Sequence, residues 1–215
     1  MRSMNTSNLS VPRIVRRHRP STRITCGNYR KTALGSLLLD FEHRCAYSMI
    51  HALDAGGYKE MEIDHFDPRR KADPVQDYVN LYYSSGHCNR SKGPTWPSAA
   101  EERLGIRFLD CCREADYGGV LFEDPNTHEI VGTTPAAKFH VVVLDLNAPH
   151  LVQRRRERAE IHRRLEEPVV LRSRYNMPER NQIQRLHDVL NEMLVHAIPP
   201  IPPPPIVTCT KTARQ

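Results

Sequence analysis

Three short segments between residues 62 and 93 carry the side-chain types needed to hydrolyse a phosphodiester. They are Glu62-Ile63-Asp64-His65-Phe66, then Asn80-Leu81, then Cys88-Asn89-Arg90-Ser91-Lys92-Gly93. Such a reaction needs a base that takes a proton from water and a cation that neutralises the charge growing on the phosphate. A histidine beside a carboxylate, followed by two asparagines and a lysine, provides both.

Each of these residues has a chemical role that suits it. His65 is the candidate general base, because a neutral imidazole accepts a proton near neutral pH. Asp64 and Asn89 offer hard oxygen ligands for Mg²⁺ or Mn²⁺. Asn80 is expected to hold the intervening loop or the imidazole, and Lys92 to reach a phosphate. Neighbours in a strand point to opposite sides, so a twist or bend at the strand end must bring Asp64 and His65 to one site.

The elements around these residues predict a hairpin followed by a helix. Residues 59–66 predict a short strand that ends at the Asp-His pair, and residues 78–83 predict a second strand. The segment 67–74 between them is rich in turn-forming residues, and a short helix from Asn89 ends at Gly93.

Further elements flank this hairpin on both sides. The patterns predict helix 31–44, helix 99–104, a hairpin of 120–123 with 129–133, strand 139–144, helix 150–166 and helix 178–196. The helix at 150–166 carries six arginines interleaved with glutamates, so a salt-bridged solvent face and a phosphate-binding face both remain open. The run of prolines at 198–205 favours extended polyproline geometry.

The central motif resembles the HNH endonucleases. In this family an Asp-His pair ends the first strand of a ββα-metal motif, an Asn lies in the middle, and an Asn or His on the helix closes the motif. The matching residues are Asp64, His65, Asn80 and Asn89. The resemblance implies that His65 is the general base, that Asp64 and Asn89 hold the divalent cation, and that Asn80 orients the base.

The resemblance extends over roughly residues 31–164, toward bacterial HNH proteins of anti-phage systems. It implies DNA as the substrate, with RNA left open. It also implies a protein partner, such as an ATPase of the kind found in Septu-like or retron-associated systems. The alternative is a catalytically inactive, HNH-shaped subunit that binds nucleic acid or serves in assembly.

One feature departs from the family pattern. Many relatives brace the motif with two Cys-x-x-Cys pairs around a structural zinc, and here the pairs read Cys45-Ala46-Tyr47-Ser48 and Ser85-Gly86-His87-Cys88. Because a serine hydroxyl is a poor zinc ligand, a four-thiolate site is excluded and a structural Zn²⁺ is not expected. His43 or His87 could complete a mixed site only at unusual spacing. We expect Cys45 and Cys88 to be buried thiols.

Charge adds a further expectation about nucleic acid. The chain has 31 Lys and Arg against 25 Asp and Glu, and the segment up to Lys31 holds eight of these basic residues and no acidic one. That end could lie on nucleic acid or form a solvated tail. An organelle transit peptide is a third reading, but the segment lacks a clear amphipathic stripe.

The basic residues nearest the motif are expected to contact the substrate. They are Arg69, Arg70 and Lys71 in the loop after the histidine, and Arg90 beside the closing asparagine. The nearby aromatic residues Tyr82, Tyr83 and Trp96 could stack on bases, but a place in the core is favoured.

Together these observations predict an α+β protein with a ββα-metal HNH core, flanking helices and a C-terminal extension of a small hairpin and helices. The expected parts are a basic arm (1–30), a nuclease core (31–97), an α/β extension (98–197) and a proline-rich tail (198–215). Six cysteines without regular spacing and the lack of a long apolar run indicate a cytosolic protein with reduced thiols and no membrane segment.

Overall fold

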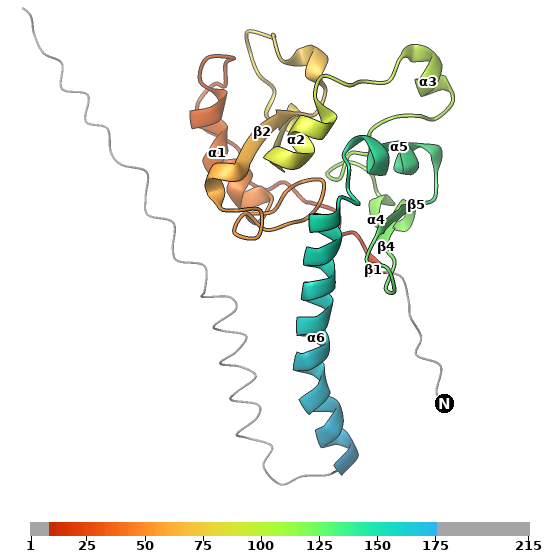
Figure 1. Ribbon diagram of the computed structural model, residues 1–215. Helices are drawn as coiled ribbons and strands as arrows, with labels where there is room; N and C mark the ends of the chain where they lie inside the picture. The colour runs from red at the N-terminus through yellow and green to blue at the C-terminus, as the bar shows by residue number, and fades with distance from the viewer. Residues whose placement is uncertain (1–8, 176–215) are drawn as a thin grey trace, which may run out of the picture. The chain divides into compact units, whose positions relative to one another are not determined.

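A computed structural model describes residues 9–175 as a mixed α+β structure (Figure 1). The helices of this part are α1 (Tyr29–Asp40), α2 (Gly86–Lys92), α3 (Ala99–Arg103), α4 (Tyr117–Val120), α5 (Pro135–Val143) and α6 (Pro149–Tyr175). The strands are β1 (Leu9–Ser10), β2 (Met61–His65), β3 (Leu81–Ser85), β4 (Leu121–Glu123) and β5 (Ile130–Gly132). Short 3₁₀ turns lie at Tyr58–Glu60, Pro68–Arg70 and Tyr78–Asn80.

The chain divides into two compact units, Met1–Ala159 and Glu160–Gln215. The first holds all described strands, α1 to α5 and the first turns of α6. The segments that the sequence suggested as an arm, a core and the first part of an extension therefore lie together in one unit, from residue 9 to residue 159. In the described part of the second unit, Glu160 accepts hydrogen bonds from Arg163 and Arg164 at 2.8 and 2.7 Å.

The hairpin of β2 and β3 carries the chemical motif. The strands are antiparallel, with Asp64 opposite Tyr82 and His65 opposite Leu81. β3 is buried along its whole length, because α1 packs against it and α2 packs against both strands. The expected core position of Tyr82 and Tyr83 is confirmed, since both are almost fully buried.

The N-terminal segment is built into the same core. Val11, Ile14 and Ile24 are buried, the N–H of Ile14 donates to the carbonyl of Cys111 at 2.9 Å, and the N–H of Gln76 donates to the carbonyl of Ile24 at 3.1 Å. From residue 11 on, the basic segment therefore has a structural role. It fixes the chain around Gln76, eleven residues after His65.

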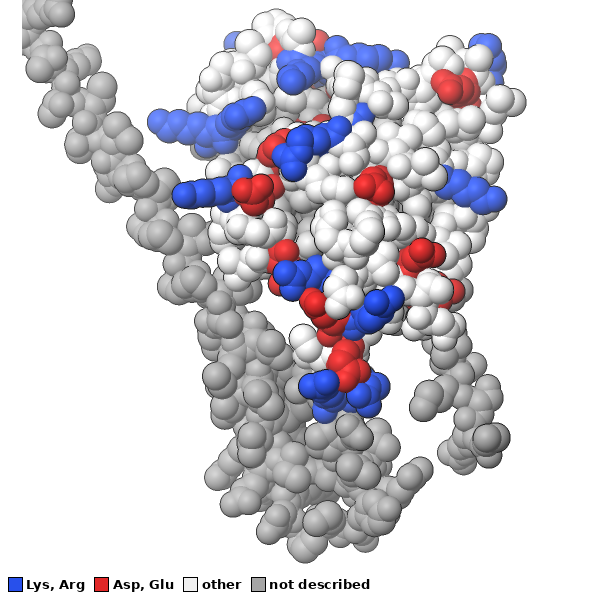
Figure 2. Space-filling model, viewed as in Figure 1, with Lys and Arg blue, Asp and Glu red and all other residues white. Residues whose placement is uncertain are grey.

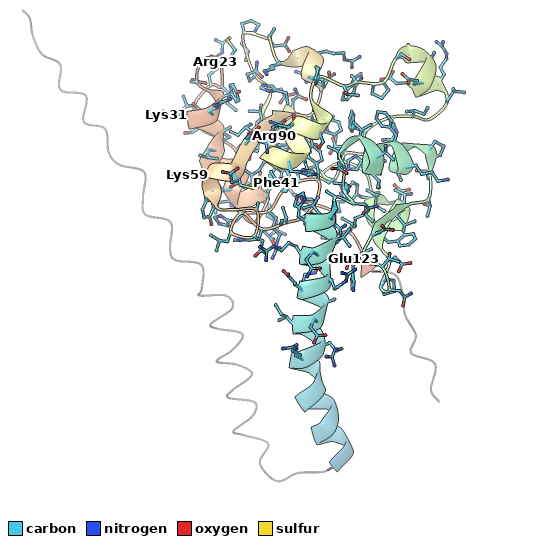
Figure 3. The ribbon with its side chains drawn as sticks, in the orientation of Figure 1. Arg23, Lys31, Phe41, Lys59, Arg90 and Glu123 are labelled. Atoms are coloured by element: carbon cyan, nitrogen blue, oxygen red, sulfur yellow. The ribbon has the colours of Figure 1, made fainter. Side chains whose placement is uncertain are left out.

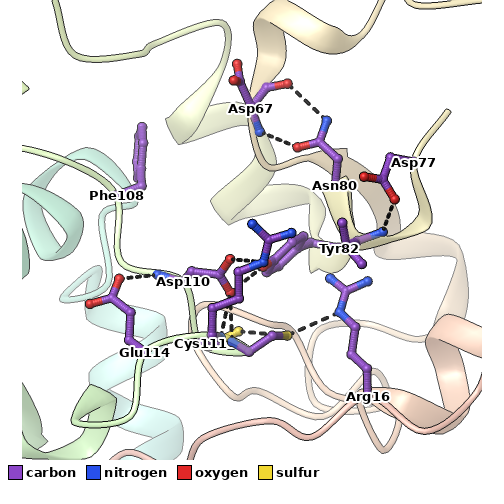
Figure 4. A network of polar contacts seen from close by, with 12 residues as sticks. Arg16, Asp67, Asp77, Asn80, Tyr82, Phe108, Asp110, Cys111 and Glu114 are labelled. Carbon is purple, nitrogen blue, oxygen red and sulfur yellow. Dashed lines mark hydrogen bonds and ion pairs between the residues drawn. The ribbon is translucent and has the colours of Figure 1, made fainter. Parts of the chain in front are cut away.

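Arg16 shows how one charge of this segment is used (Figure 4). Its guanidinium lies over the ring of Tyr82 at 4.5 Å and donates to the carbonyl of Tyr78 at 2.7 Å and to Sγ of Cys112 at 3.3 Å. The hydroxyl of Tyr82 donates to Asp110 at 2.5 Å. Arg16 therefore stabilises the hairpin. Its guanidinium is engaged by the protein, so it is not free to bind a nucleic-acid backbone.

Two predictions about elements are corrected. Residues 139–144 were predicted as a strand, which is wrong, because Phe139 to Val143 lie in α5. This helix is capped by the side chain of Thr134 and has Pro135 in its first turn. Its buried residues, Ala136, Ala137, His140 and Val141, repeat with helical spacing, which outweighs the β propensity of the valines.

The helix predicted from Asn89 begins earlier, at Gly86. The side chain of Ser85 accepts a hydrogen bond from the N–H of Cys88 and caps it. The predicted helix at 178–196 and the proline run at 198–205 lie outside the described residues. None of the helices in residues 9–175 combines the length and apolar character needed to cross a lipid bilayer.

A close backbone approach allows the fold to be tested. A Cβ added at Gly132 in β5 would lie 2.5 Å from the carbonyl carbon of Ala137 in α5. We expect Gly132→Ala to lower the free energy of unfolding by about 2 kcal/mol or more, because backbone atoms must move apart. The matched control is Gly35→Ala inside α1, where nothing lies within 4 Å of the added atom. It should leave the stability equal or raise it by up to about 1 kcal/mol. Urea unfolding of both variants measures the difference, and equal stability of the two would contradict the packing of α5 on β5.

Candidate active site

A pocket of about 320 Å³ gathers the motif residues beside β2 and the loop that follows it. Asp64 and His65 from β2 line it together with Asn89 from α2, so the three residues predicted for base and metal share one site. Glu62, Lys71 and the first residues of α1, Tyr29 and Arg30, complete its wall.

The proton on His65 is placed by a chain of hydrogen bonds through Gln76. The side-chain nitrogen of Gln76 donates to the carbonyls of Lys71 and Asp73 at 3.2 and 2.6 Å, so the amide oxygen must face His65. That oxygen lies 2.8 Å from Nε2 of His65. Nε2 therefore carries the proton, and Nδ1 keeps a lone pair that can accept one.

Burial sets the charge of this imidazole. His65 is 4% exposed, and burial lowers its pKa below the usual 6.5, although the hydrogen bond with Gln76 opposes the shift. The ring also packs edge-on against Tyr29, with centroids 4.9 Å apart. At neutral pH the imidazole is therefore neutral and rigidly held, as a general base requires.

Asp64 is held by a buried ion pair. Nζ of Lys92 lies 3.0 Å from Oδ1 and 2.9 Å from Oδ2 of Asp64, and it also donates to the carbonyl of His65 at 2.8 Å. The hydroxyl of Tyr47 donates to Oδ2. Lys92 is fully buried, so its ammonium is directed at Asp64 and not at solvent. The structure places this lysine behind the carboxylate, and not on the open side of the pocket where a phosphate would lie.

The pKa shifts of this group follow from burial. Burial raises the pKa of Asp64, while the ammonium of Lys92 and the hydroxyl of Tyr47 favour its ionised form. Burial likewise lowers the pKa of Lys92, against the charge of Asp64. Burial and then the charge of Asp64 raise the pKa of Tyr47 well above its usual range, so its hydroxyl stays protonated and donates. With the Lys92 ammonium and the Tyr47 hydroxyl both donating to the carboxylate, we assign the ionised pair.

Asn89 reaches the pocket from α2 in a fixed orientation. Its side-chain nitrogen donates to Oε2 of Glu62, which leaves the amide oxygen as an acceptor. Arg90, labelled in Figure 3, lies 3.4 Å from Oε1 of the same glutamate and is exposed. The arginine predicted to bind substrate is therefore already paired with an acidic residue at the edge of the site.

Asn80 holds the loop and not the imidazole. Its amide oxygen accepts from the N–H of Asp67 at 2.8 Å, and its nitrogen donates to the carbonyl of Asp67 at 3.2 Å (Figure 4). These two bonds close the loop between β2 and β3. The structure gives the task of orienting His65 to Gln76.

The basic loop residues differ in what they can bind. Arg69 is engaged by Asp67 at 2.8 and 2.9 Å and lies over the ring of Trp96 at 4.8 Å, and Arg70 pairs with Asp73 and Asp77. Lys71 is exposed and lines the pocket. Among the described residues, no ion pair to its ammonium occurs. Arg30 also lines the pocket. Its only side-chain hydrogen bond in the described part of the chain is to Tyr29.

Surface charge is mixed and not segregated. On the face shown in Figure 2, arginine and lysine side chains lie next to acidic ones. Arg154 pairs with Glu157 at 3.0 Å on α6, in line with a salt-bridged helix face. Binding of a phosphate backbone at the pocket would therefore depend on Lys71 and Arg30, which form no ion pair among the described residues.

Hydrogen bonds and packing hold the positions at which the HNH pattern has a zinc brace. Cys45 and Cys88 are free, buried thiols, and Sγ of Cys45 lies 3.8 Å from Oγ of Ser84. Ser85, at one of the cysteine positions of that pattern, caps α2. The two histidines considered as further ligands have other partners: His43 contacts the hydroxyl of Tyr58 at 3.1 Å, and His87 the carbonyl of Asp145 at 3.2 Å.

The donors in the pocket fit one hard divalent cation. A carboxylate has about four lone-pair sites, and the hydrogen bonds from Lys92 and Tyr47 use two of them, so Asp64 retains acceptor capacity for a metal. The oxygen of Asn89 offers a second ligand. In the described residues, no group of three or more His, Cys, Asp or Glu side chains is arranged to hold a metal ion. Binding would thus rely on one carboxylate and one amide, with water and substrate in the remaining positions.

Four functional residues were not found from the sequence: Gln76, Tyr47, Glu62 and Arg30. Glu62 carried a usable signal, because it lies two residues before Asp64 and so on the same face of β2. Gln76, Tyr47 and Arg30 come from loops and the start of a helix, and only the tertiary structure brings them to the site.

Comparisons with protein-family models, with curated proteins and with solved structures gave no match.

The role of Gln76 can be tested without any activity. We expect ¹⁵N NMR of the imidazole to show the Nε2–H tautomer of His65 in the wild type, and a pKa below 6.5. Gln76→Met removes the acceptor while keeping the size of the side chain, so the tautomer preference should weaken and the pKa should fall further. Gln153→Met on the exposed face of α6 is the control and should leave the His65 signals unchanged. An Nδ1–H tautomer in the wild type would show that Gln76 does not position the base.

Proposed function

We propose that this protein is a metal-dependent HNH endonuclease that hydrolyses phosphodiester bonds in DNA. The observation that carries the proposal is the shared pocket of His65, Asp64 and Asn89, in which Nδ1 of His65 keeps its lone pair. A base with a depressed pKa beside two hard oxygen donors is the arrangement that metal-assisted hydrolysis needs.

The order of elements supports the same proposal. An antiparallel hairpin followed directly by a short helix carries the Asp-His pair at the end of its first strand and Asn89 on the helix. This is the order of the ββα-metal motif that the sequence resembles. Asn80 lies between the two, closing the loop through Asp67.

The residues of the chain divide the work of hydrolysis among them. Nδ1 of His65 takes a proton from the attacking water, while Gln76 holds Nε2–H and stabilises the imidazolium that forms. Asp64 and Asn89 would hold a Mg²⁺ or Mn²⁺ ion, which supplies the positive charge that stabilises the phosphate in the transition state. Lys92 and Tyr47 keep Asp64 ionised and fixed in place. Arg30 and Lys71 attract the backbone of the substrate.

The proposal also covers how the enzyme would recognise DNA and how its cleavage would be controlled. The sequence offers no separate base-reading module, so cleavage should be weakly sequence-selective and should need control by another component. The resemblance to anti-phage HNH proteins suggests an effector that works with a partner, such as an ATPase.

One observation favours a second candidate function. Lys92 already neutralises Asp64 from the buried side, which reduces the pull of this carboxylate on a metal ion. A catalytically inactive HNH-shaped subunit that binds nucleic acid or serves in assembly would keep the same fold. Cleavage assays separate the two candidates.

We expect the purified protein, alone or with its native partner, to nick plasmid DNA in Mg²⁺ or Mn²⁺ and not in EDTA. His65→Ala should lower the rate at least about 100-fold, because a general base contributes about 10² to 10⁴. Because the base works in its neutral form, and burial lowers the pKa of His65, the rate should rise with pH through a value below 6.5 and stay level around pH 7.

The matched control is His150→Ala, which removes an exposed histidine at the start of α6 and should retain cleavage. DNA binding by the wild type without metal-dependent cutting, also with the native partner present, would favour the inactive subunit. Equal cutting by the wild type and His65→Ala would contradict the assigned base.

The cations of the pocket give a separate prediction about DNA affinity. In a His65→Ala background, Arg30→Ala and Lys71→Ala should each weaken binding of a DNA duplex and reduce the slope of log K against log salt by about 1. Arg69→Ala is the control, because Asp67 and Trp96 already engage that side chain. Fluorescence anisotropy over a salt series measures all three. A larger loss of DNA affinity in Arg69→Ala than in Lys71→Ala would contradict the placement of the DNA at the pocket.

A further inference from the structure

A second cavity, of about 260 Å³, lies apart from the candidate active site. Its apolar wall is formed by Val11, Leu121, Ile130 and Leu146, all buried. Arginines line it as well, and we call it the arginine cavity after them: Arg44, Arg155 and Arg158.

Arg155 is the central observation. It is 4% exposed, and its hydrogen bonds go only to neutral oxygens. Nε donates to the carbonyl of His128 at 2.6 Å, and Nη2 to the carbonyl of Leu146 at 2.9 Å and to Oδ1 of Asn147 at 3.2 Å. Nη1 is buried and has no hydrogen-bond partner among the described residues.

The one acidic residue of the wall does not balance this charge. Glu123 accepts from Arg158 and lies 3.0 Å from Nδ1 of His128, so both its oxygens are engaged. Arg44 donates to the carbonyl of Met49 at 3.3 Å, and it forms no ion pair within residues 9–175. Three arginines and one glutamate thus line the cavity, which gives its lining an excess of two positive charges.

Burying the guanidinium of Arg155 without a counter-charge costs free energy of folding. A buried charge is normally paired, and a buried N–H without a partner costs about 1 to 3 kcal/mol. Burial lowers the pKa of Arg155, but a guanidinium remains protonated in proteins, so the charge cannot be lost by deprotonation. An anion in the cavity would supply both the missing charge and an acceptor.

We propose that the arginine cavity binds a small organic anion, with a phosphate or carboxylate group near Arg155 and Arg44 and an apolar body against Val11, Leu121 and Ile130. Its volume is small for a ligand site, which suits a compact molecule. Bare phosphate would leave the apolar wall uncovered. An uncharged molecule would leave the arginines unbalanced.

This site does not depend on the proposed nuclease function. Within the described part of the chain, the arginine cavity and the pocket around His65 have no lining residue in common, and Tyr47, whose hydroxyl donates to Asp64, connects the two walls. A ligand of the first can therefore be distinguished from a phosphate in the second by mutation of either wall.

Phenyl phosphate is the probe for the test, with benzoate, phenol and inorganic phosphate as comparisons. Isothermal titration calorimetry of the full chain should show saturable one-to-one binding of phenyl phosphate, weaker binding of inorganic phosphate and none of phenol. The strength of benzoate relative to phenyl phosphate tells which anionic group the cavity prefers. Lack of binding by both organic anions overturns the proposal.

Variants locate the binding. Arg155→Met should weaken phenyl phosphate about tenfold or more, because a charge-assisted hydrogen bond is lost. Arg156→Met, the exposed neighbour on α6, should change nothing. Arg44→Met is the second test, since it removes a single side-chain bond to the backbone and decides the matter if Arg155→Met fails to fold.

His65→Ala should leave the affinity for phenyl phosphate unchanged. Loss of binding in His65→Ala, or full binding in both Arg44→Met and Arg155→Met, would show that the anion lies elsewhere and would overturn the proposal.

Discussion

The buried ion pair between Asp64 and Lys92 is the interaction on which the site depends. Lys92 is the last residue of α2, and it bonds both the carboxylate of Asp64 and the carbonyl of His65 at the end of β2. The pair therefore fixes the helix that carries Asn89 against the strand that carries His65. Removing one partner would leave a buried charge uncompensated, at a cost of about 3 to 5 kcal/mol. Tyr47 adds a third anchor, from the loop after α1.

In the proposed mechanism the carboxylate of Asp64 has two roles: it pairs with Lys92 and it binds the metal ion. The ammonium keeps Asp64 ionised inside the protein, but it also takes up part of the negative charge that a metal ion would otherwise feel. Hydrogen bonds also hold two other parts of the site, the start of α2 and the loop between β2 and β3. Ser85 caps α2, and Asn80 closes the loop through the backbone of Asp67. The local shape of the site thus rests on polar contacts and on the packing of β3.

The sequence predicted the parts of the site that depend on local order. Asp64, His65 and Asn89 line one pocket, since a hairpin and the helix that follows it bring near neighbours in the chain together. Gln76 could not be predicted, because it reaches His65 only through a loop that is fixed by Ile24 in the N-terminal segment. The charges of that segment left a nucleic-acid arm and a solvated tail both open, and the contacts of Arg16 with Tyr78, Tyr82 and Cys112 could not be predicted from them. Similarly, three valines favoured a strand at 139–144, where the cap at Thr134 and the burial pattern produce α5.

We propose that Nδ1 of His65 takes the proton from the attacking water, and chemical rescue by imidazole tests this role. A His65→Gly variant leaves space for imidazole beside Gln76 and Tyr29. The measurement is the rate of metal-dependent DNA cleavage by this variant, with added imidazole and without it, compared with the wild type. The account predicts that cleavage is lost in the variant and returns in proportion to neutral imidazole. Cleavage by His65→Gly at the wild-type rate, with no response to imidazole, would contradict it.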